Sequence, residues 1–190
     1  MGLKQFKTGF FDLEFTGERQ FTTPVSIGMV GEKNEELYLT FKDYDKTQVN
    51  DWLKENVISQ IDEKKRISKE EGLARITKWL NNYRKNKNIS FISFGKTIDL
   101  ILLFQFWHTK SLSVKYFHYL HHLPNFLNHS SHFDLTTIFY LAGINPDIDR
   151  NKFLKLPKGR RHNALYDAKI VKKCYDKLLT IQNFPLFFNE

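Results

Sequence analysis

The first forty residues alternate between apolar stretches and turn-forming residues. Residues 9–15, 24–30 and 36–41 are rich in aromatic and β-branched side chains, which is typical of strands. A Thr-Gly pair follows the first stretch, and the segment GEKNE separates the second from the third. The pattern predicts three strands joined in an antiparallel meander.

Helical spacing dominates the rest of the chain. Apolar residues recur three and four positions apart over residues 47–61, 69–83, 98–107, 134–142 and 163–179. The run ISFISF, which ends before Gly95, predicts one more buried strand. We expect Asp134 to cap the helix that follows it.

Two segments lack a clear period. Residues 108–132 are rich in His, Tyr and Phe, and residues 145–161 read as a basic connection with two prolines. The chain contains no internal repeat and no low-complexity tract long enough to be a linker. We therefore predict a single α/β domain over residues 1–190.

Two acids lie inside a run of phenylalanines, FFDLEF at 10–15. Side chains alternate across a strand, so Asp12 and Glu14 share one face with Phe10. Two carboxylates this close repel each other, and their burial is unfavourable unless a cation compensates the charge. A divalent ion with oxygen ligands supplies that compensation.

Two further acids fall on apolar helix faces. Asp99 shares a face with Leu103, and Asp167 lies on the stripe that continues through Val171 and Cys174. A carboxylate in such a position also needs a partner.

Each acid has a structural explanation when it is taken singly. Asp99 can cap its helix, Asp167 can pair with an arginine, and Glu14 can lie at a frayed strand edge. If instead all four acids converge, they form a site for two divalent ions of the kind used in phosphoryl transfer.

Three short motifs resemble those of the DEDD 3′–5′ exonucleases. DLEFTG at 12–17 is similar to the first motif of that family, Asp-x-Glu-x-Thr-Gly. SFGKTID, which ends at Asp99, resembles the second motif, and HNALYDA at 162–168 resembles the third. A histidine five positions before the last acid marks the DEDDh branch, whereas the other branch carries Tyr at the position of Asn163.

The second motif departs from the family pattern, because Phe94 and Gly95 stand where many relatives have His-Asn. The departure weakens any role of these two positions in substrate contact but leaves Asp99 in place. Together with the SIG segment at 26–28, the motifs are most similar to small stand-alone bacterial exoribonucleases of the DEDDh branch.

This resemblance implies a ribonuclease H-like fold, with a mixed five-stranded sheet built from the antiparallel meander plus parallel strands and flanked by helices. It implies two ions, Mg²⁺ or Mn²⁺, and a general base at His162. The implied metal ligands and catalytic acids are Asp12, Glu14, Asp99 and Asp167.

The resemblance also implies a place for the substrate. Backbone at Phe15, Thr16 and Gly17 would receive the terminal sugar, although Phe15 can equally belong to the core. Phe94 is either core or a platform on which a base stacks.

A basic stretch precedes His162 and contributes Lys155, Lys158, Arg160 and Arg161. We expect this stretch to be mobile and to contact phosphates, and the alternative is a solvated basic loop.

Composition agrees with a polyanionic partner without requiring one. The net charge is +8 and the pI is about 9.4, values that suit nucleic acid but that also occur in lysine-rich chains from AT-rich genomes. The single cysteine excludes an internal disulfide. The first residues do not resemble a signal peptide and no apolar run spans a membrane, so we expect a cytoplasmic protein with no membrane partner.

The histidines at 118, 121 and 122 invite a zinc interpretation, but no cysteine lies nearby and the spacing fits no closed site. We expect residues 108–132 to form an aromatic-anchored segment over the site instead. The functional prediction is a metal-dependent 3′–5′ exonuclease on single-stranded ends, with RNA favoured and a homodimer as one option. The alternatives are a DNA exonuclease for proofreading or repair, and a nucleic-acid-binding module that lacks catalysis.

Overall fold

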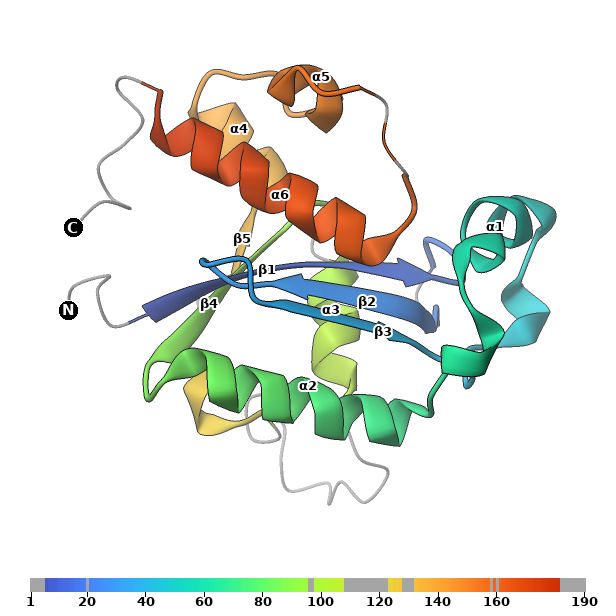
Figure 1. Cartoon of the computed structure of the whole chain (residues 1–190). Coiled ribbons are helices and arrows are strands. Elements are labelled where there is room, and N and C mark those ends of the chain that lie inside the picture. The colour runs from blue at the N-terminus through green and yellow to red at the C-terminus, as the bar shows by residue number, and fades with distance from the viewer. Residues whose placement is uncertain are drawn as a thin grey trace.

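A five-stranded mixed sheet with strand order β3-β2-β1-β4-β5 lies at the centre of the computed structural model (Figure 1). The structure describes residues 6–19, 21–95, 98–107, 123–127, 132–157, 159 and 161–181. The strands are β1 (Phe6–Phe15), β2 (Pro24–Val30), β3 (Glu36–Thr40), β4 (Asn88–Ser93) and β5 (His132–Asp134). The first three strands pair antiparallel, and β4 and β5 continue the sheet in parallel. The predicted mixed five-stranded sheet with its meander is confirmed.

Helices cover both faces of this sheet (Figure 1). The α-helices are α1 (Asp51–Asn56), α2 (Lys69–Arg84), α3 (Ile98–Gln105), α4 (Leu135–Leu141), α5 (Arg150–Leu154) and α6 (Ala164–Leu179). Short 3₁₀ turns are η2 (Lys46–Gln48), η3 (Ile58–Gln60), η4 (Glu63–Lys65) and η6 (Asn125–Leu127). In the described part of the chain, none of the helices has the length and apolar character needed to cross a membrane.

The alternation along β1 divides its side chains between two cores. Phe11 and Leu13 are buried in the core under α2 and α3, whereas Phe10 packs with α4 and α6 on the opposite face. Asp12 and Glu14 follow Phe10 in the period-two pattern, so they point toward the α6 side. Both acids therefore lie on the face of the sheet that α6 covers.

Gly28 lets α6 lie unusually close to the sheet. It pairs with Asp12 across β1 and β2. A Cβ atom at Gly28 would lie 2.3 Å from the carbonyl oxygen of Ala164 and 2.3 Å from the backbone nitrogen of Leu165. Only a glycine allows the first turn of α6 to rest on the strand directly beside Asp12.

The predicted helix over residues 47–61 is wrong as a continuous element. The segment consists of η2, α1 and η3. Extended backbone at Val49 and Asn50 separates η2 from α1, and Val57 lies between α1 and η3. The side chain of Asn50 accepts a hydrogen bond from the backbone N–H of Leu53 and starts a new helix. Asp45 does the same for η2, so polar side chains compete for the N–H groups that a single long helix would need.

Two other expectations need correction. The basic connection predicted at 145–161 contains a helix, α5, which Asp149 caps by accepting from the N–H of Lys152. The fifth strand, β5, lies at the end of the irregular segment, where its short length hides the strand pattern. Asp134 caps α4 as predicted, since its side chain accepts from the N–H of Thr136.

Candidate active site

A cavity of about 500 Å³ opens at the carboxyl end of β1. It is bounded by residues of β1, α1, α3, α4, α5 and α6 and by the turns after β1 and β4. Nine predicted site residues line it: Asp12, Glu14, Phe15, Thr16, Gly17, Phe94, Asp99, His162 and Asp167. The fold therefore brings three sequence motifs, which are spread over about 150 positions of the chain, to one cavity.

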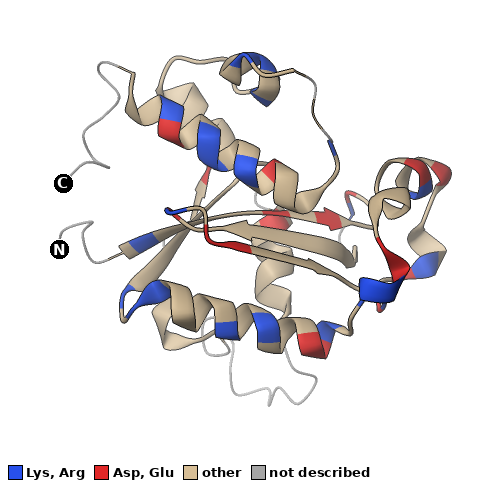
Figure 2. Ribbon diagram, viewed as in Figure 1, with Lys and Arg blue, Asp and Glu red and all other residues tan. Residues whose placement is uncertain are grey.

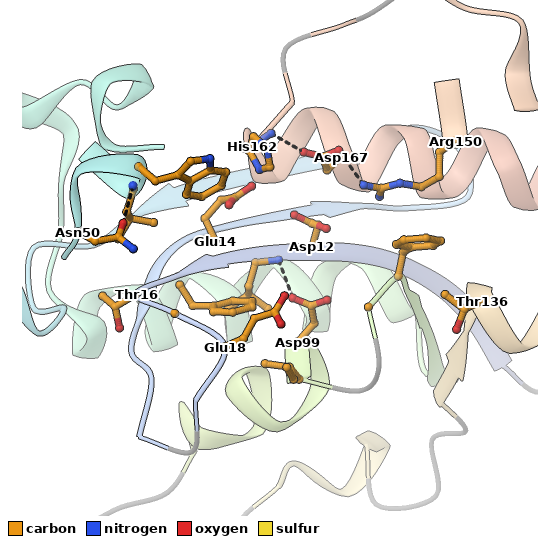
Figure 3. Close-up of a pocket in the computed structure, with 18 of the residues that line it drawn as sticks. Asp12, Glu14, Thr16, Glu18, Asn50, Asp99, Thr136, Arg150, His162 and Asp167 are labelled. Carbon is orange, nitrogen blue, oxygen red and sulfur yellow. Dashed lines mark hydrogen bonds and ion pairs between the residues drawn. The ribbon is translucent and has the colours of Figure 1, made fainter. Parts of the chain in front are cut away.

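Three carboxylates converge inside this cavity. One oxygen each from Asp12, Glu14 and Asp167 lies within 4.8 Å of the others. Asp12 and Asp167 are buried and Glu14 is partly buried. Figure 3 shows Asp12 and Glu14 pointing from β1 toward Asp167 on α6. All-oxygen ligation of this kind suits Mg²⁺ or Mn²⁺ better than zinc.

Asp99 approaches the same strand from the α3 side (Figure 3). Its Oδ1 accepts a hydrogen bond of 3.1 Å from the backbone N–H of Leu13. The pairing of β1 with β4 ends at Phe10, so on this side of β1 the Asp99 carboxylate takes the place that a continued strand β4 would occupy beside Leu13. Asp99 is 4% exposed and lies outside the group of three close carboxylates.

The loop before α6 fixes the relation between His162 and Asp167. The backbone N–H of His162 donates to Oδ2 of Asp167 over 3.0 Å. His162 has a φ of 63°, in the left-handed region that is uncommon for residues other than glycine. Asn163 then caps α6 by accepting from the N–H of Tyr166. The strained residue and the cap together place the imidazole beside the carboxylates.

Burial raises the pKa of each of the four acids. The pKa of Glu14 rises to about 8, through burial first and then through the charges of Asp167 and Asp99. Burial raises the pKa of Asp99 to about 7. The pKa values of Asp12 and Asp167 are raised for the same primary reason. Burial thus disfavours the ionised forms of these carboxylates, and a cation bound between them would stabilise those forms.

His162 lies in a less polar environment than an exposed histidine. Its imidazole meets the indole of Trp52 edge-on, with ring centroids 4.8 Å apart. Burial is the main cause that lowers its pKa below the usual 6.5. The charge of Asp167 opposes this shift, and the charges of Arg161 and Arg150 add to it. The ring is therefore neutral at pH 7, the form that can accept a proton.

Sequence reasoning missed several residues of the cavity. Arg150 donates from Nη2 to Oδ1 of Asp167 at 3.2 Å, and its guanidinium lies over the ring of Phe94 at 4.4 Å from the centroid. In the sequence, Arg150 ends the segment NPDIDR, where it follows two acids in an otherwise basic stretch, but nothing in that segment indicates a contact with Asp167. The other missed lining residues include Glu18, Asn50, Trp52, Thr136 and Asp147.

The turn after β1 uses much of its own hydrogen-bonding capacity. Thr16 is 2% exposed, its N–H donates to the carbonyl of Thr23, and its hydroxyl donates to Gln48. The N–H of Gly17 donates to the hydroxyl of Thr22. These two N–H groups are therefore not available to a ligand that binds at this turn. Phe15 lines the cavity and also packs against the core, so both of its predicted roles are compatible with its position.

The basic stretch before His162 is only partly described. Arg161 forms an ion pair of 2.7 Å with Asp149 and does not line the cavity. Lys158, Arg160 and residues 108–122, which include the predicted histidine-rich cover, lie outside the described residues.

The charge of the cavity is opposite to that of the chain as a whole. The described lining residues include the acids Asp12, Glu14, Glu18, Asp99, Asp147 and Asp167, with Arg150 as the only lysine or arginine among them. Figure 2 shows that Lys and Arg are spread along α2 and α6, while acidic positions occur on β1 and at the start of α6, the two elements that carry the carboxylate cluster. A polyanion would be repelled from this cavity until cations compensate the acids.

Comparisons with known proteins give a structural match without a sequence match. No family model matches the chain, and no curated protein matches it significantly in sequence. The structure of Pop2p from S. pombe in its Mg²⁺- and Mn²⁺-bound form is similar, with a TM-score of 0.66 and 13% identity over 99% of this chain and 87% of that one. A chain in the structure of the yeast NOT1 MIF4G domain co-crystallized with CAF1 gives a TM-score of 0.58 and 13% identity, covering 96% and 83%.

The fold is ribonuclease H-like. At 13% identity the match concerns the fold alone, and neither structure supports the particular resemblance to small bacterial exoribonucleases. The Pop2p structure contains Mg²⁺ and Mn²⁺, and the cluster of Asp12, Glu14 and Asp167 in this chain can hold a divalent metal ion.

Proposed function

We propose that this chain is a metal-dependent DEDDh exonuclease that removes nucleotides from single-stranded 3′ ends. The observation that carries the proposal is the convergence of Asp12, Glu14 and Asp167 within 4.8 Å, in a cavity that Asp99 and His162 also line. These are the residues that the three sequence motifs single out. Because these residues lie close together in the structure, we infer that the three motifs form a single site.

The donor set fits two divalent ions. Asp12, Glu14 and Asp167 would hold one ion, and Asp12 together with Asp99 would hold a second. When bound, Mg²⁺ or Mn²⁺ would supply Lewis-acid stabilisation of the attacking and leaving oxygens of a phosphodiester. The raised pKa values of Glu14 and Asp99 support this assignment, because divalent charge favours the ionised forms that burial disfavours.

His162 would act as the general base. Its lowered pKa keeps the imidazole neutral at pH 7, and the contact with Trp52 limits the orientations of the ring. The hydrogen bond from its backbone N–H to Asp167 ties the base to a metal ligand. The imidazole can thus take the proton of an attacking water close to the acids.

The remaining features of the proposal rest on the sequence resemblance. RNA is favoured over DNA, and the chain is treated as one catalytic domain over residues 1–190 that acts in the cytoplasm. Phe15, Thr16, Gly17, Phe94, Arg160 and Arg161 are the proposed substrate contacts. Thr16 and Gly17 would contribute groups other than their N–H donors, which are bonded within the turn, and Arg161 would exchange its ion pair with Asp149 for a phosphate. Kinship with small bacterial exoribonucleases and a homodimeric state belong to the same resemblance.

One observation favours the alternative of a non-catalytic binding module. The guanidinium of Arg150 already compensates part of the acidic charge through its ion pair with Asp167. A site with an internal cation can persist without metal. The experiment must therefore separate turnover from binding.

The decisive test is digestion of 5′-labelled single-stranded RNA and DNA of the same sequence, with Mg²⁺ or Mn²⁺ and with an EDTA control. Asp12→Asn should abolish turnover, whereas Asp176→Asn, which changes an acid of α6 that does not line the cavity, should leave it intact. A ladder that shortens from the 3′ end supports the proposal, and the faster substrate decides between RNA and DNA. Metal-independent binding without shortening of either strand would establish the binding module instead.

A further inference from the structure

Arg150 begins α5 and extends into the acidic cavity (Figure 3). Its Nη2 donates to Oδ1 of Asp167 at 3.2 Å, and its guanidinium lies on the face of the Phe94 ring. The side chain is 17% exposed. Two contacts from different elements therefore hold an almost buried cation beside the carboxylate cluster.

The guanidinium is not fully satisfied in this position. Its Nη1 is buried and has no hydrogen-bond partner among the described residues. An arginine carries five N–H donors in a planar fork, and a buried charged donor without an acceptor is unfavourable. Nη1 of Arg150 can therefore donate a hydrogen bond to an acceptor that enters the cavity.

The oxygens of Asp167 are divided between two donors. Oδ1 faces Arg150, and Oδ2 accepts from the backbone N–H of His162. A divalent ion on this carboxylate would compete with the guanidinium for Oδ1 and would repel it. The stacking contact with Phe94 does not involve Asp167, so it can keep the released guanidinium inside the cavity.

We propose that Arg150 is a phosphate-contacting residue of this site, and that Asp167 holds its guanidinium until a divalent cation takes that carboxylate. This inference rests on the proposed nuclease function. The planar fork of arginine fits two non-bridging oxygens of a phosphate. Arg150 is also the only described arginine or lysine that lines the cavity, so it is the residue placed to offer that contact.

Binding measurements on the full chain, freed of metal with EDTA, test this inference. The probes are Mn²⁺ alone and uridine 5′-monophosphate added to the Mn²⁺-loaded protein, both followed by calorimetry. Arg150→Met keeps an unbranched apolar stem but removes the charge, and Arg150→Lys keeps the charge but removes the fork. Arg75→Met, which breaks an exposed ion pair with Glu71 on α2, is the matched control.

We expect Arg150→Met to bind Mn²⁺ several-fold more tightly than the wild type, because the competing cation is gone. The same variant should bind uridine 5′-monophosphate at least about tenfold more weakly, since a charge-assisted bidentate contact is lost. Arg150→Lys should restore only part of the nucleotide affinity, and Arg75→Met should change neither affinity. Thermal unfolding of each variant verifies that the binding data come from folded protein.

The outcomes separate this inference from the proposed function. If the wild type binds Mn²⁺ and the nucleotide but Arg150→Met retains the nucleotide affinity, Arg150 is only a counter-ion and the inference is overturned. Weaker Mn²⁺ binding in Arg150→Met overturns it as well, because Arg150 would then support the metal site rather than compete for it. If the wild type binds neither probe, the nuclease proposal itself fails, and this inference fails with it.

Discussion

The indole ring of Trp52 meets the imidazole ring of His162 edge-on, at a centroid distance of 4.8 Å and an interplanar angle of 81°. Trp52 belongs to α1, whereas His162 precedes α6. Trp52 remains 51% exposed, so its contribution to the core is small. The same region also holds the His162 loop through a hydrogen bond from Gln60 to the carbonyl of Arg161. The segment around α1 therefore acts as a support for the proposed general base.

Replacing Trp52 by alanine should lower kcat about three- to tenfold, which corresponds to the loss of one aromatic pair. Burial is the largest cause of the lowered His162 pKa, and the variant exposes the imidazole to water. The pKa of His162 should therefore rise toward its usual value, and the acidic limb of the pH–kcat profile should move to higher pH. An unchanged profile would contradict the assigned role.

A control for the loss of an indole is Trp79→Ala on α2. Trp79 stacks on Tyr83 and does not line the cavity. This variant should lose some stability without a shift of the pH profile. The conservative variant Trp52→Phe should retain most of the activity, because a phenyl edge can still contact the imidazole.

Gly28→Ala should damage the site without touching a carboxylate. The added methyl group would collide with backbone atoms of Ala164 and Leu165 and would push the start of α6 away from β1. Overpacking of this kind costs roughly 1–3 kcal/mol in stability. Because α6 carries Asp167, we also expect weaker Mn²⁺ binding, measured by calorimetry on protein that is folded at the working temperature.

The matched control for this change is Gly9→Ala. A Cβ at Gly9 would meet side-chain atoms of Phe91 at 3.1 Å, on a ring that can shift, rather than backbone. Gly9→Ala should lose less stability than Gly28→Ala and keep the Mn²⁺ affinity. Equal effects of the two changes on Mn²⁺ binding would contradict the role assigned to Gly28.

The sequence was sufficient to predict the elements whose pattern is strong. The strand β2 matches its prediction at both ends, and α2 and α6 differ from theirs by one residue. Alternation along β1 correctly placed Asp12 and Glu14 on one face. Patterns of this kind are local, so they can be read without tertiary contacts.

The failures occur where local polar side chains or long-range contacts decide the structure. Asn50 divides the predicted helix at 47–61, because its side chain caps a new helix. The spacing of apolar residues gives no information about such a polar cap. Arg150 could not be predicted to reach Asp167, because its position depends on how α5 packs on α6. The sequence did raise the option that Asp167 pairs with an arginine, and that pair is present together with the acid cluster.

The pH dependence of thermal stability should report how unfavourable it is to ionise the buried carboxylates when no metal is bound. Folding raises the pKa of Glu14 from 4.5 to about 8 and that of Asp99 from 3.8 to about 7. The folded state therefore binds more protons than the unfolded chain between these values, and its stability falls as the pH rises through this window. With EDTA present, we expect the unfolding temperature to drop between about pH 5 and pH 8.

Metal and mutation should both counteract this drop. Mn²⁺ binds the ionised carboxylates, so its stabilising effect should grow with pH over the same window. Asp12→Asn removes one of the mutually repelling charges and should raise the unfolding temperature of the metal-free protein at pH 8 by at least about 2 °C. Calorimetric scans with EDTA and with Mn²⁺ measure both effects, and a metal-free stability that rises toward pH 8 would contradict the burial of these acids.

Asp99→Asn should separate the structural role of Asp99 from its charge. The amide oxygen of asparagine can still accept the hydrogen bond from the N–H of Leu13, so the turn of α3 against β1 should persist and thermal stability should not fall. Loss of the charge removes the proposed second metal site while Asp12, Glu14 and Asp167 remain. We therefore expect a fall in kcat of about two orders of magnitude or more with one Mn²⁺ still bound.

Asp99→Ala, which also leaves the Leu13 N–H without its acceptor, should be less stable than Asp99→Asn but no less active. If Asp99→Asn keeps wild-type turnover, Asp99 is a structural acceptor and catalysis depends on the other three acids alone.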